Sequence, residues 1–328
     1  MNISFVIPVY NADASLTKCL ESIVPYLLKG CEAVVVNDGS TDASVSIIET
    51  FAKKYNGIKL INQENKGQSA ARNEAIRKAS GEYIWCLDSD DWISEDGIAV
   101  VKEALDKALY DVVVIGRVEE YKNSSKATPQ LIYKEYNNGV DFFNDASLNG
   151  TYRTQPWNII VKRSLILEND VFFPEGRTFE DIYWGINLFL HAERVVTLPI
   201  HPYHYFLANE NSLTKQIHQR DMDAVWIIDE AARLLDESDN ILTSDSPSFL
   251  TLIYWFVSSA IMKKYMPLYD THQGAREIVN ALLTDEVFKK SVRYAAFHYI
   301  GLTRSGLALL LFVSPTLYKV SLKMLLAK

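Results

Sequence analysis

The first 120 residues alternate short apolar runs, rich in β-branched residues, with segments of helical periodicity, and this alternation is the strongest constraint on the fold. Strands that alternate with helices are typical of a parallel sheet covered by helices. The runs predicted as strands are residues 3–8, 33–37, 58–62, 83–87 and 111–115. The sequence therefore predicts an α/β fold for this part of the chain.

Helices are predicted between these strands and again in the last third of the chain. Apolar residues recur at three- and four-residue spacings, as in a helix that packs one face on a sheet, in three segments, 16–23, 45–51 and 98–105. The pattern loosens over residues 121–177 and then predicts a helix at 180–192 and a short strand at 195–198. Beyond Arg220 we expect three or four helices and no strand.

The composition fits a globular protein of the cytoplasm. With 328 residues, of which 48% are hydrophobic, the chain can build a sizeable core. The apolar start ends at a proline and is followed by polar residues, so we interpret it as a first strand and not as a signal peptide. Because Cys19, Cys31 and Cys86 lack the spacing of metal ligands, we expect buried, reduced thiols.

Four clusters of polar residues follow predicted strands or open a predicted helix. They lie at residues 8–11, 37–42, 65–73 and 88–91. In an open parallel sheet, ligands bind beyond the carboxyl ends of the strands. Each cluster by itself could be an ordinary turn or a helix cap. Because the carboxyl ends of neighbouring strands converge, the four clusters together predict one binding crevice.

The cluster at residues 88–91 places Asp88, Asp90 and Asp91 directly after an apolar run. Crowded carboxylates repel one another unless a cation or a polar partner offsets their charge. Magnesium typically binds one or two carboxylates together with the phosphates of a substrate. The alternative is an acidic turn that caps the next helix, although a cap needs only one such residue. The cluster therefore predicts a metal site.

Four segments together resemble the signature of family 2 glycosyltransferases with the GT-A fold. They are 3–11 (ISFVIPVYN), 34–42 (VVVNDGSTD), 65–73 (NKGQSAARN) and 84–91 (IWCLDSDD), in the order and spacing of that family. Glu180 and Asp181, with Trp184, extend the resemblance further along the chain. It implies a mainly parallel sheet with helices on both faces, followed here by a helical C-terminal region.

The resemblance also implies that the chain is an enzyme with a uridine-diphosphate sugar as donor. Pro8 and Tyr10 would line the uracil, Asp38 would hydrogen-bond the edge of the base, and Asp90 would bind the metal, Mn²⁺ or Mg²⁺. Asn65 and Arg72 would help to hold the uridine diphosphate. The donor-binding residues carried over in this way are Pro8, Val9, Tyr10, Asn11, Asp38, Asn65, Gly67, Arg72, Asp88 and Ser89.

Glu180 and Asp181 open the helix predicted at 180–192. Acidic residues in a first helical turn are common because they interact favourably with the helix dipole. By the family resemblance, however, Asp181 is the catalytic base, and Glu180 is a neighbour that positions it or contacts the acceptor. A single base and no nucleophile on the other face of the sugar imply one displacement with inversion at the anomeric carbon.

Further along, the chain offers candidates for acceptor and metal contacts. Trp157 and Asn158 resemble a tryptophan-asparagine pair of the family and are predicted to contact the acceptor, with core packing as the equal alternative for Trp157. His204 and Ser212 lie where relatives place a residue that touches the metal or the diphosphate. The alternative for His204 is a packed or surface histidine.

These observations predict an inverting, metal-dependent hexosyltransferase that moves a sugar from a UDP-sugar to a hydroxyl of a polysaccharide or a lipid-linked glycan. The alternative is an inactive subunit that binds nucleotide sugars or scaffolds a polysaccharide assembly complex. A nucleotidyltransferase is disfavoured because residues 8–14 contain no glycine, and a dehydrogenase because G-x-G-x-x-G is absent. We expect no nucleic-acid partner.

We predict a transferase domain at residues 1–218, with a nucleotide-binding half at 1–120 and an acceptor half at 121–218. A helical region follows at 219–328. After Glu286 the chain has seven basic and no acidic residues, and two apolar stretches there, 302–313 and 316–327, are too short to span a bilayer. This tail is expected either to lie on the anionic inner face of the cell membrane or to dock on the body.

Overall fold

In this computed structural model, the described residues are 2–107, 109–129, 131–149, 151, 155–207, 219–238, 242–298, 308, 311, 314, 318 and 321. The contacts divide the chain into two compact units. The first comprises Met1–Gly139 and Arg153–Ser212, and the second comprises Val140–Tyr152 and Leu213–Lys328. The domain boundary proposed after residue 218 stays a prediction. Each unit is described by itself.

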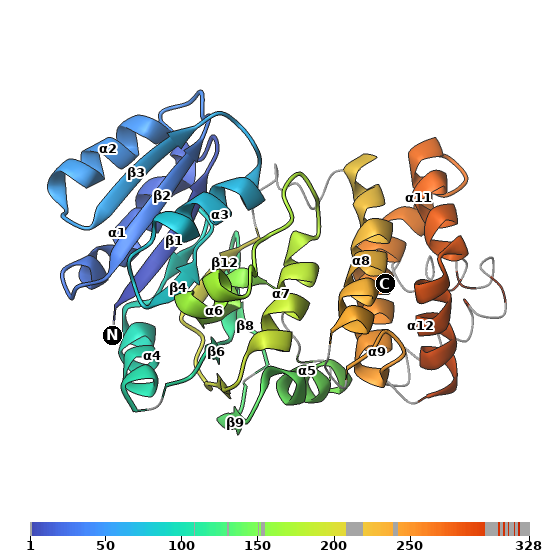
Figure 1. Ribbon diagram of the computed structural model, residues 1–328. Helices are drawn as coiled ribbons and strands as arrows, with labels where there is room; N and C mark the ends of the chain where they lie inside the picture. Colours follow the sequence, from blue (N-terminus) through green and yellow to red (C-terminus); the bar gives the residue numbers. More distant parts are fainter. Residues whose placement is uncertain are drawn as a thin grey trace. The chain divides into compact units, whose positions relative to one another are not determined.

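The first unit is built on an eight-stranded sheet with the order β3-β2-β1-β4-β10-β6-β11-β9 (Figure 1). In that order the strands are Ile58–Gln63, Glu32–Asp38, Ile3–Val9, Tyr83–Cys86, Ile159–Lys162, Val112–Val114, Val195–Thr197 and Lys134–Tyr136. The strands β3, β2, β1 and β4 pair in parallel. β10 is antiparallel to both of its neighbours. The predicted α/β fold with a mainly parallel sheet is confirmed.

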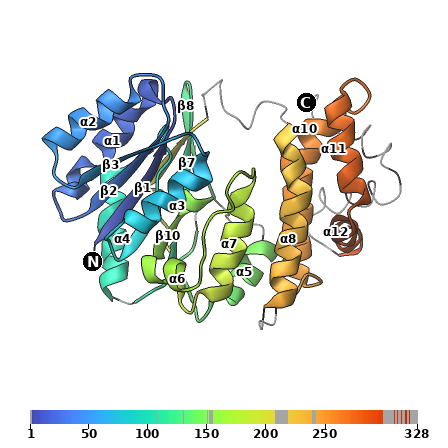
Figure 2. The ribbon, with the colours of Figure 1, turned by 45° about the horizontal axis from the view of Figure 1, so that its top comes forward.

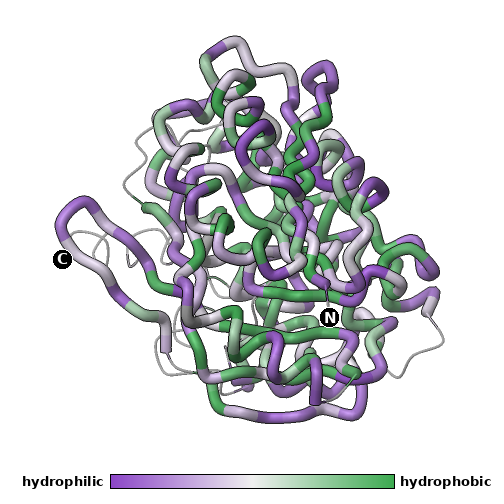
Figure 3. Tube along the Cα trace, turned by 90° about the vertical axis from the view of Figure 1, so that its left-hand side faces the viewer, coloured by the Kyte–Doolittle hydropathy of each residue, from purple (hydrophilic) through white to green (hydrophobic). Residues whose placement is uncertain are grey.

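Helices cover both faces of the parallel half of this sheet (Figures 1 and 2). On one face, α1 (Asp13–Leu27), α2 (Ser44–Lys54) and α4 (Glu95–Lys107) contribute to a core that includes Phe5 and Trp85. On the other face, α3 (Gln68–Lys78) packs on β1 and β2. Strands covered on both faces are continuous apolar runs, which explains why every residue of β1 is buried. Figure 3 shows such apolar stretches alternating with polar ones along the chain.

The remaining elements of the first unit include a second, four-stranded sheet. Its order is β5-β12-β7-β8, with β5 at Trp92–Ile93, β12 at Tyr203–Phe206, β7 at Arg117–Tyr121 and β8 at Ser124–Ala127. The sequence patterns predicted neither this sheet nor β9 and β10, because these strands are short and several are half-exposed. The helical segments beside them are η1 (Pro156–Asn158), α6 (Arg163–Glu168) and α7 (Glu180–His191).

The described part of the second unit is helical, as predicted for the C-terminal region. After α5 (Gly139–Leu148), which begins at the boundary, its elements are η3 (Gln219–Met222), α8 (Asp223–Glu237), α9 (Pro247–Phe256), η4 (Val257–Met262), α10 (Lys263–Tyr265), η5 (Met266–Leu268), α11 (Gln273–Thr284) and α12 (Glu286–Phe297). None of the helices described is both long and apolar enough to cross a membrane. The two tail stretches, 302–313 and 316–327, lie outside the described residues except for four positions.

Glu32 ties together the amino ends of several strands. Its carboxylate accepts hydrogen bonds from the Ser4 hydroxyl at 2.6 Å and the Ser80 hydroxyl at 2.9 Å, and it pairs with Lys59 at 2.7 Å. Burial by itself would raise the pKa of Glu32, but the bonds from Lys59, Ser4 and Ser80 outweigh it and lower the pKa to about 2. This carboxylate therefore stabilises the folded state only when it is ionised.

Replacing Glu32 with glutamine should lower the free energy of unfolding by about 2 kcal/mol near neutral pH. The pKa in the folded state lies below the ordinary value of 4.5, so the stabilising contribution is complete above that value and is lost as the pH falls towards about 2. Urea unfolding of the wild type and of Glu32→Gln, at neutral pH and at about pH 3, measures the difference in their free energies of unfolding. The difference should shrink in acid; an unchanged difference would contradict this account.

Candidate active site

The loops that follow β1 and β2 are joined at the carboxyl edge of the sheet. The Thr41 amide donates a hydrogen bond to Asn11 Oδ1 at 2.8 Å, and the Asn11 amide donates to Ser40 Oγ at 3.1 Å. Pro8 and Val9 are buried within β1, whereas the Tyr10 side chain is 53% exposed. Of the four donor-binding residues predicted here, Tyr10 and Asn11 therefore present accessible side chains.

Asp38 holds the neighbouring loop in place. Its buried carboxylate accepts hydrogen bonds from the side chain of Gln63 at 2.7 Å and from the amides of Lys66 and Gly67, each at 2.8 Å. Gly39 has a φ of 75°, and a Cβ there would lie 3.0 Å from the amide nitrogen of Asn65, so the two loops approach closely. The structure assigns Asp38 a loop-holding role, and its contact with a base stays a prediction.

Arg72 bridges two segments that are far apart in the sequence. Its guanidinium donates from Nη2 to Asp88 at 2.7 Å and from Nη1 to Glu180 at 2.9 Å. The side chain is only 3% exposed and lies over the ring of Phe173 at 5.3 Å. A guanidinium presents its donors in a planar fork, so a single side chain can bind two carboxylates at once. This bridge brings the first turn of α7 to the acidic loop, residues 88–91.

Glu180 begins α7, and Asp181 follows it in the same turn. Burial raises the pKa of Glu180 to about 7, the charge of Asp181 adds to the rise, and Arg72 opposes it. Asp181 itself is half-buried. The structure therefore places Glu180, and with it the Glu180-Asp181 pair, beside Arg72. Arg72 is a predicted donor-binding residue that lies 108 positions before Glu180 in the chain.

The three carboxylates of the acidic loop have different surroundings. Asp88 accepts from Arg72 and from Gln68 at 3.1 Å. Asp91 is 1% exposed and accepts from the hydroxyl of Tyr203 at 2.6 Å. Burial, followed by the charges of Asp88 and Asp90, raises the pKa of Asp91 well above its usual range. Asp90 and Ser89 are half-buried. Asp91 is thus an internal anchor, and Asp90 remains the candidate metal ligand.

Trp157 and Asn158, the predicted acceptor residues, lie in the interior. Trp157 is 5% exposed and stacks on Tyr203 with ring centres 4.4 Å apart. Asn158 is buried and donates from Nδ2 to the carbonyl oxygen of Ile115 at 2.8 Å. Core packing, the alternative considered for Trp157, is what the structure shows. A direct contact with an acceptor stays a prediction, and this burial does not favour it.

His204 lies on β12 within a cluster of aromatic and charged side chains. Its Nδ1 is 2.7 Å from Glu120 Oε1, and its ring stacks on Trp92 with centres 5.3 Å apart. Lys18 Nζ lies 2.8 Å from the centre of the Trp92 ring. Among the residues the structure describes, no group of three or more His, Cys, Asp or Glu side chains could hold a metal ion. Contact of His204 with a metal stays a prediction, and Ser212 lies outside the described residues.

Several residues at this edge received no role from the sequence. Gln68 lies within one of the four signature segments but was not singled out. Asn73 is buried and exchanges hydrogen bonds with the backbone of Phe173, each 2.9 Å long, which ties α3 to the segment before α7. Tyr203 carries no local signal, because its partners precede it by more than a hundred positions. Only a known fold reveals such partners.

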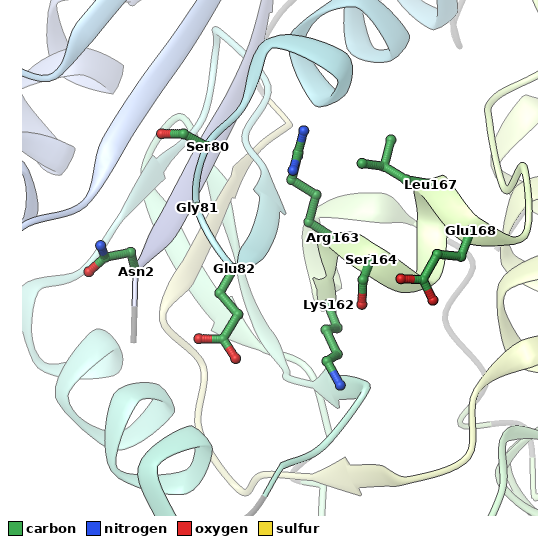
Figure 4. A pocket seen from close by; sticks show the side chains of 9 residues that line it. All are labelled: Asn2, Ser80, Gly81, Glu82, Lys162, Arg163, Ser164, Leu167 and Glu168. Atoms are coloured by element: carbon green, nitrogen blue, oxygen red, sulfur yellow. The ribbon is translucent and has the colours of Figure 1, made fainter.

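A pocket of 690 Å³ lies at the opposite, amino edge of the sheet (Figure 4). Its lining comprises Asn2, Ser80, Gly81, Glu82, Lys162, Arg163, Ser164, Leu167 and Glu168. β1 begins at Ile3 and β4 begins at Tyr83, so the pocket lies before these strands and not after them. Its acidic and basic side chains form no constellation with a recognisable chemistry. The candidate site is therefore the carboxyl edge.

Comparison with known proteins identifies relatives of this arrangement. Residues 4–166 match the model of the family "Glycosyl transferase family 2". The protein described as "Putative glycosyltransferase EpsH" of Bacillus subtilis is 28% identical over 88% of this chain and 85% of its own length. The poly(ribitol-phosphate) beta-glucosyltransferase of Bacillus spizizenii is 31% identical over 64% of this chain, which spans only 33% of that protein.

A solved structure has the same fold. Residues 1–349 of TarS from Staphylococcus aureus, in complex with UDP-GlcNAc, align with a TM-score of 0.77. The alignment covers 98% of this chain and 89% of the TarS chain, at 21% sequence identity. At this identity the likeness concerns the fold, and it includes the helical C-terminal region.

Proposed function

The chain belongs to glycosyl transferase family 2, and on that premise we propose that it transfers a sugar from a UDP-sugar to a hydroxyl of a polysaccharide or a lipid-linked glycan, with inversion. One observation carries the proposal: Arg72 joins Asp88, in the donor half, to Glu180, at the start of α7. A transferase needs its donor and its base at one place, and this bridge satisfies that need. The UDP-GlcNAc bound to TarS supports the donor class.

Asp181 is the proposed general base. It takes the proton of the acceptor hydroxyl while that oxygen forms a bond to the anomeric carbon of the sugar. The bond from the anomeric carbon to the diphosphate breaks in the same step, and its electron pair leaves with UDP. Within the Glu180-Asp181 pair, the base role is proposed for Asp181 on the family resemblance, and Glu180 accepts a hydrogen bond from Arg72 at 2.9 Å. A single displacement of this kind inverts the configuration.

The residues at the acidic loop are compatible with a divalent cation, Mn²⁺ or Mg²⁺. Such a cation is typically held by one or two carboxylates together with phosphate oxygens, so it does not require three protein ligands. Asp90 is the proposed ligand, on the family resemblance of the acidic loop, in which Asp91 is bonded to Tyr203 and Asp88 to Arg72. When bound, the cation would neutralise charge on the leaving diphosphate. Tyr10 and Asn11, at the end of β1, are proposed to meet the uridine.

A thermal-shift screen of UDP-sugars, with and without manganese, tests the proposal. The correct donor at about a hundred times its dissociation constant should raise the melting temperature by about 5 °C. The shift should need manganese and should weaken in Asp90→Asn. Transfer assays on the donors that bind then separate an active enzyme from an inactive scaffolding subunit. If no sugar nucleotide shifts the melting temperature, the proposal is wrong.

A further inference from the structure

Tyr203 contacts the acidic loop from β12, which pairs with β5, the strand that follows the loop. It is fully buried on β12. Its hydroxyl donates to Asp91 Oδ2 at 2.6 Å and accepts from the amide of Asp88 at 3.3 Å. One oxygen atom therefore contacts the first and the last residue of the loop.

Asp91 is held at its other oxygen as well. Its Oδ1 accepts the amide of Phe206 at 2.8 Å, so both carboxylate oxygens are bonded to β12. The amide of Asp91 also donates to the carbonyl oxygen of Asp88 at 3.1 Å, which closes the loop as a turn. Since Asp91 is 1% exposed, a water molecule cannot easily replace these partners. The position of the loop thus depends on bonds to β12.

The ring of Tyr203 is fixed in turn. It stacks on Trp157 at 4.4 Å with an angle of 12° between the rings, and Trp157 belongs to the core under the sheet. The carbonyl oxygen of Trp157 accepts the indole N–H of Trp85 in β4, the strand from which the acidic loop emerges, at 2.9 Å. Tyr203 therefore links the loop to the core that supports it.

We infer that Tyr203 is a positioning residue for sugar transfer: its hydroxyl holds the acidic loop so that Asp88 meets the ribose or sugar of the donor and Asp90 meets the cation. This inference rests on the proposed function of the site. Tyr203 does not touch the substrate, so its removal should weaken the binding of donor and metal by displacing the loop. A purely structural tyrosine would instead affect stability and leave the constants of the folded enzyme unchanged.

The decisive comparison is Tyr203→Phe against Tyr205→Phe. The first variant keeps the stacked ring and removes only the hydroxyl. The second is a matched control, because Tyr205 also stacks on Trp157, at 5.2 Å, and its hydroxyl makes no hydrogen bond to the acidic loop within the described residues. Losing one hydrogen bond should raise the donor KM and the half-saturating manganese concentration about tenfold in Tyr203→Phe. Tyr205→Phe should match the wild type.

An unchanged donor KM and manganese requirement in Tyr203→Phe would overturn the inference, even if the melting temperature fell. If that variant does not fold, Asp91→Asn tests the same anchor, because an amide has one acceptor oxygen and cannot accept both the Tyr203 hydroxyl and the Phe206 amide. Hydrogen exchange of residues 88–91 in the ligand-free protein gives an independent readout and should be faster in Tyr203→Phe alone. If the wild type transfers no sugar but residues 88–91 still exchange faster in Tyr203→Phe, the proposed function is refuted. Tyr203 would then still be an anchor of the acidic loop.

Discussion

Asp181→Asn should reduce the rate of sugar transfer about a thousandfold and leave UDP-sugar affinity nearly unchanged, because the amide has the size of the carboxylate but cannot take the acceptor proton. Asp181 is half-buried in the first turn of α7, next to the Arg72 bridge. Initial-rate kinetics give the loss in kcat, and calorimetric titration with the donor gives the affinity. A fall in kcat with constant donor affinity indicates an interaction made only in the transition state.

The competing explanation for Asp181 is a favourable charge at a helix start. In that case, the substitution would cost about 1 kcal/mol of stability and leave turnover almost intact. Glu286→Gln is a suitable control, because Glu286 occupies the first turn of α12 in the other unit. It should show only the small stability effect. If Glu180→Gln were inactive and Asp181→Asn active, Glu180 and not Asp181 would be the base. The mechanism, a single displacement assisted by a base, would stand.

Arg72→Lys should lower kcat about a hundredfold, since a displacement of about 1 Å between a base and its substrate can cost that much. An ammonium group lacks the planar fork of a guanidinium, so lysine cannot keep both Asp88 and Glu180 in the observed geometry. The first turn of α7 would then lose its fixed position over the donor. Steady-state kinetics, varying donor and acceptor separately, measure the effect.

Two further variants sharpen this test. The double variant, Arg72→Lys with Glu180→Gln, should have a kcat no lower than that of the more damaging single variant, because both changes remove the same contact. Lys78→Gln on the same helix is the control, since Lys78 is 61% exposed and should tolerate substitution. A rise in the donor KM at constant kcat would instead mean that Arg72 contacts the diphosphate directly, as the family resemblance alone suggests.

The sequence predicts the parallel half of the sheet well because its information is local. β1, β2 and β4 are buried on both faces and are therefore mainly apolar runs, whereas β3 is a partly exposed edge strand; all four lie close to the expected bounds. β7, β8 and β12 escape such patterns, because their burial is partial and their pairing depends on distant partners.

For the candidate site, the sequence by itself determined which residue types stand after which strands: Tyr10, the carboxylates of the acidic loop, and the Glu180-Asp181 pair at a helix start. These follow from short-range order along the chain. Only the tertiary structure decided how they combine. Arg72 faces Glu180 across 108 positions, and Asp91 is bound by Tyr203 across 112 positions, so Asp91 is an anchor. Periodicity records which face of an element is apolar, whereas a buried charge acquires its role from the partner that the fold places beside it.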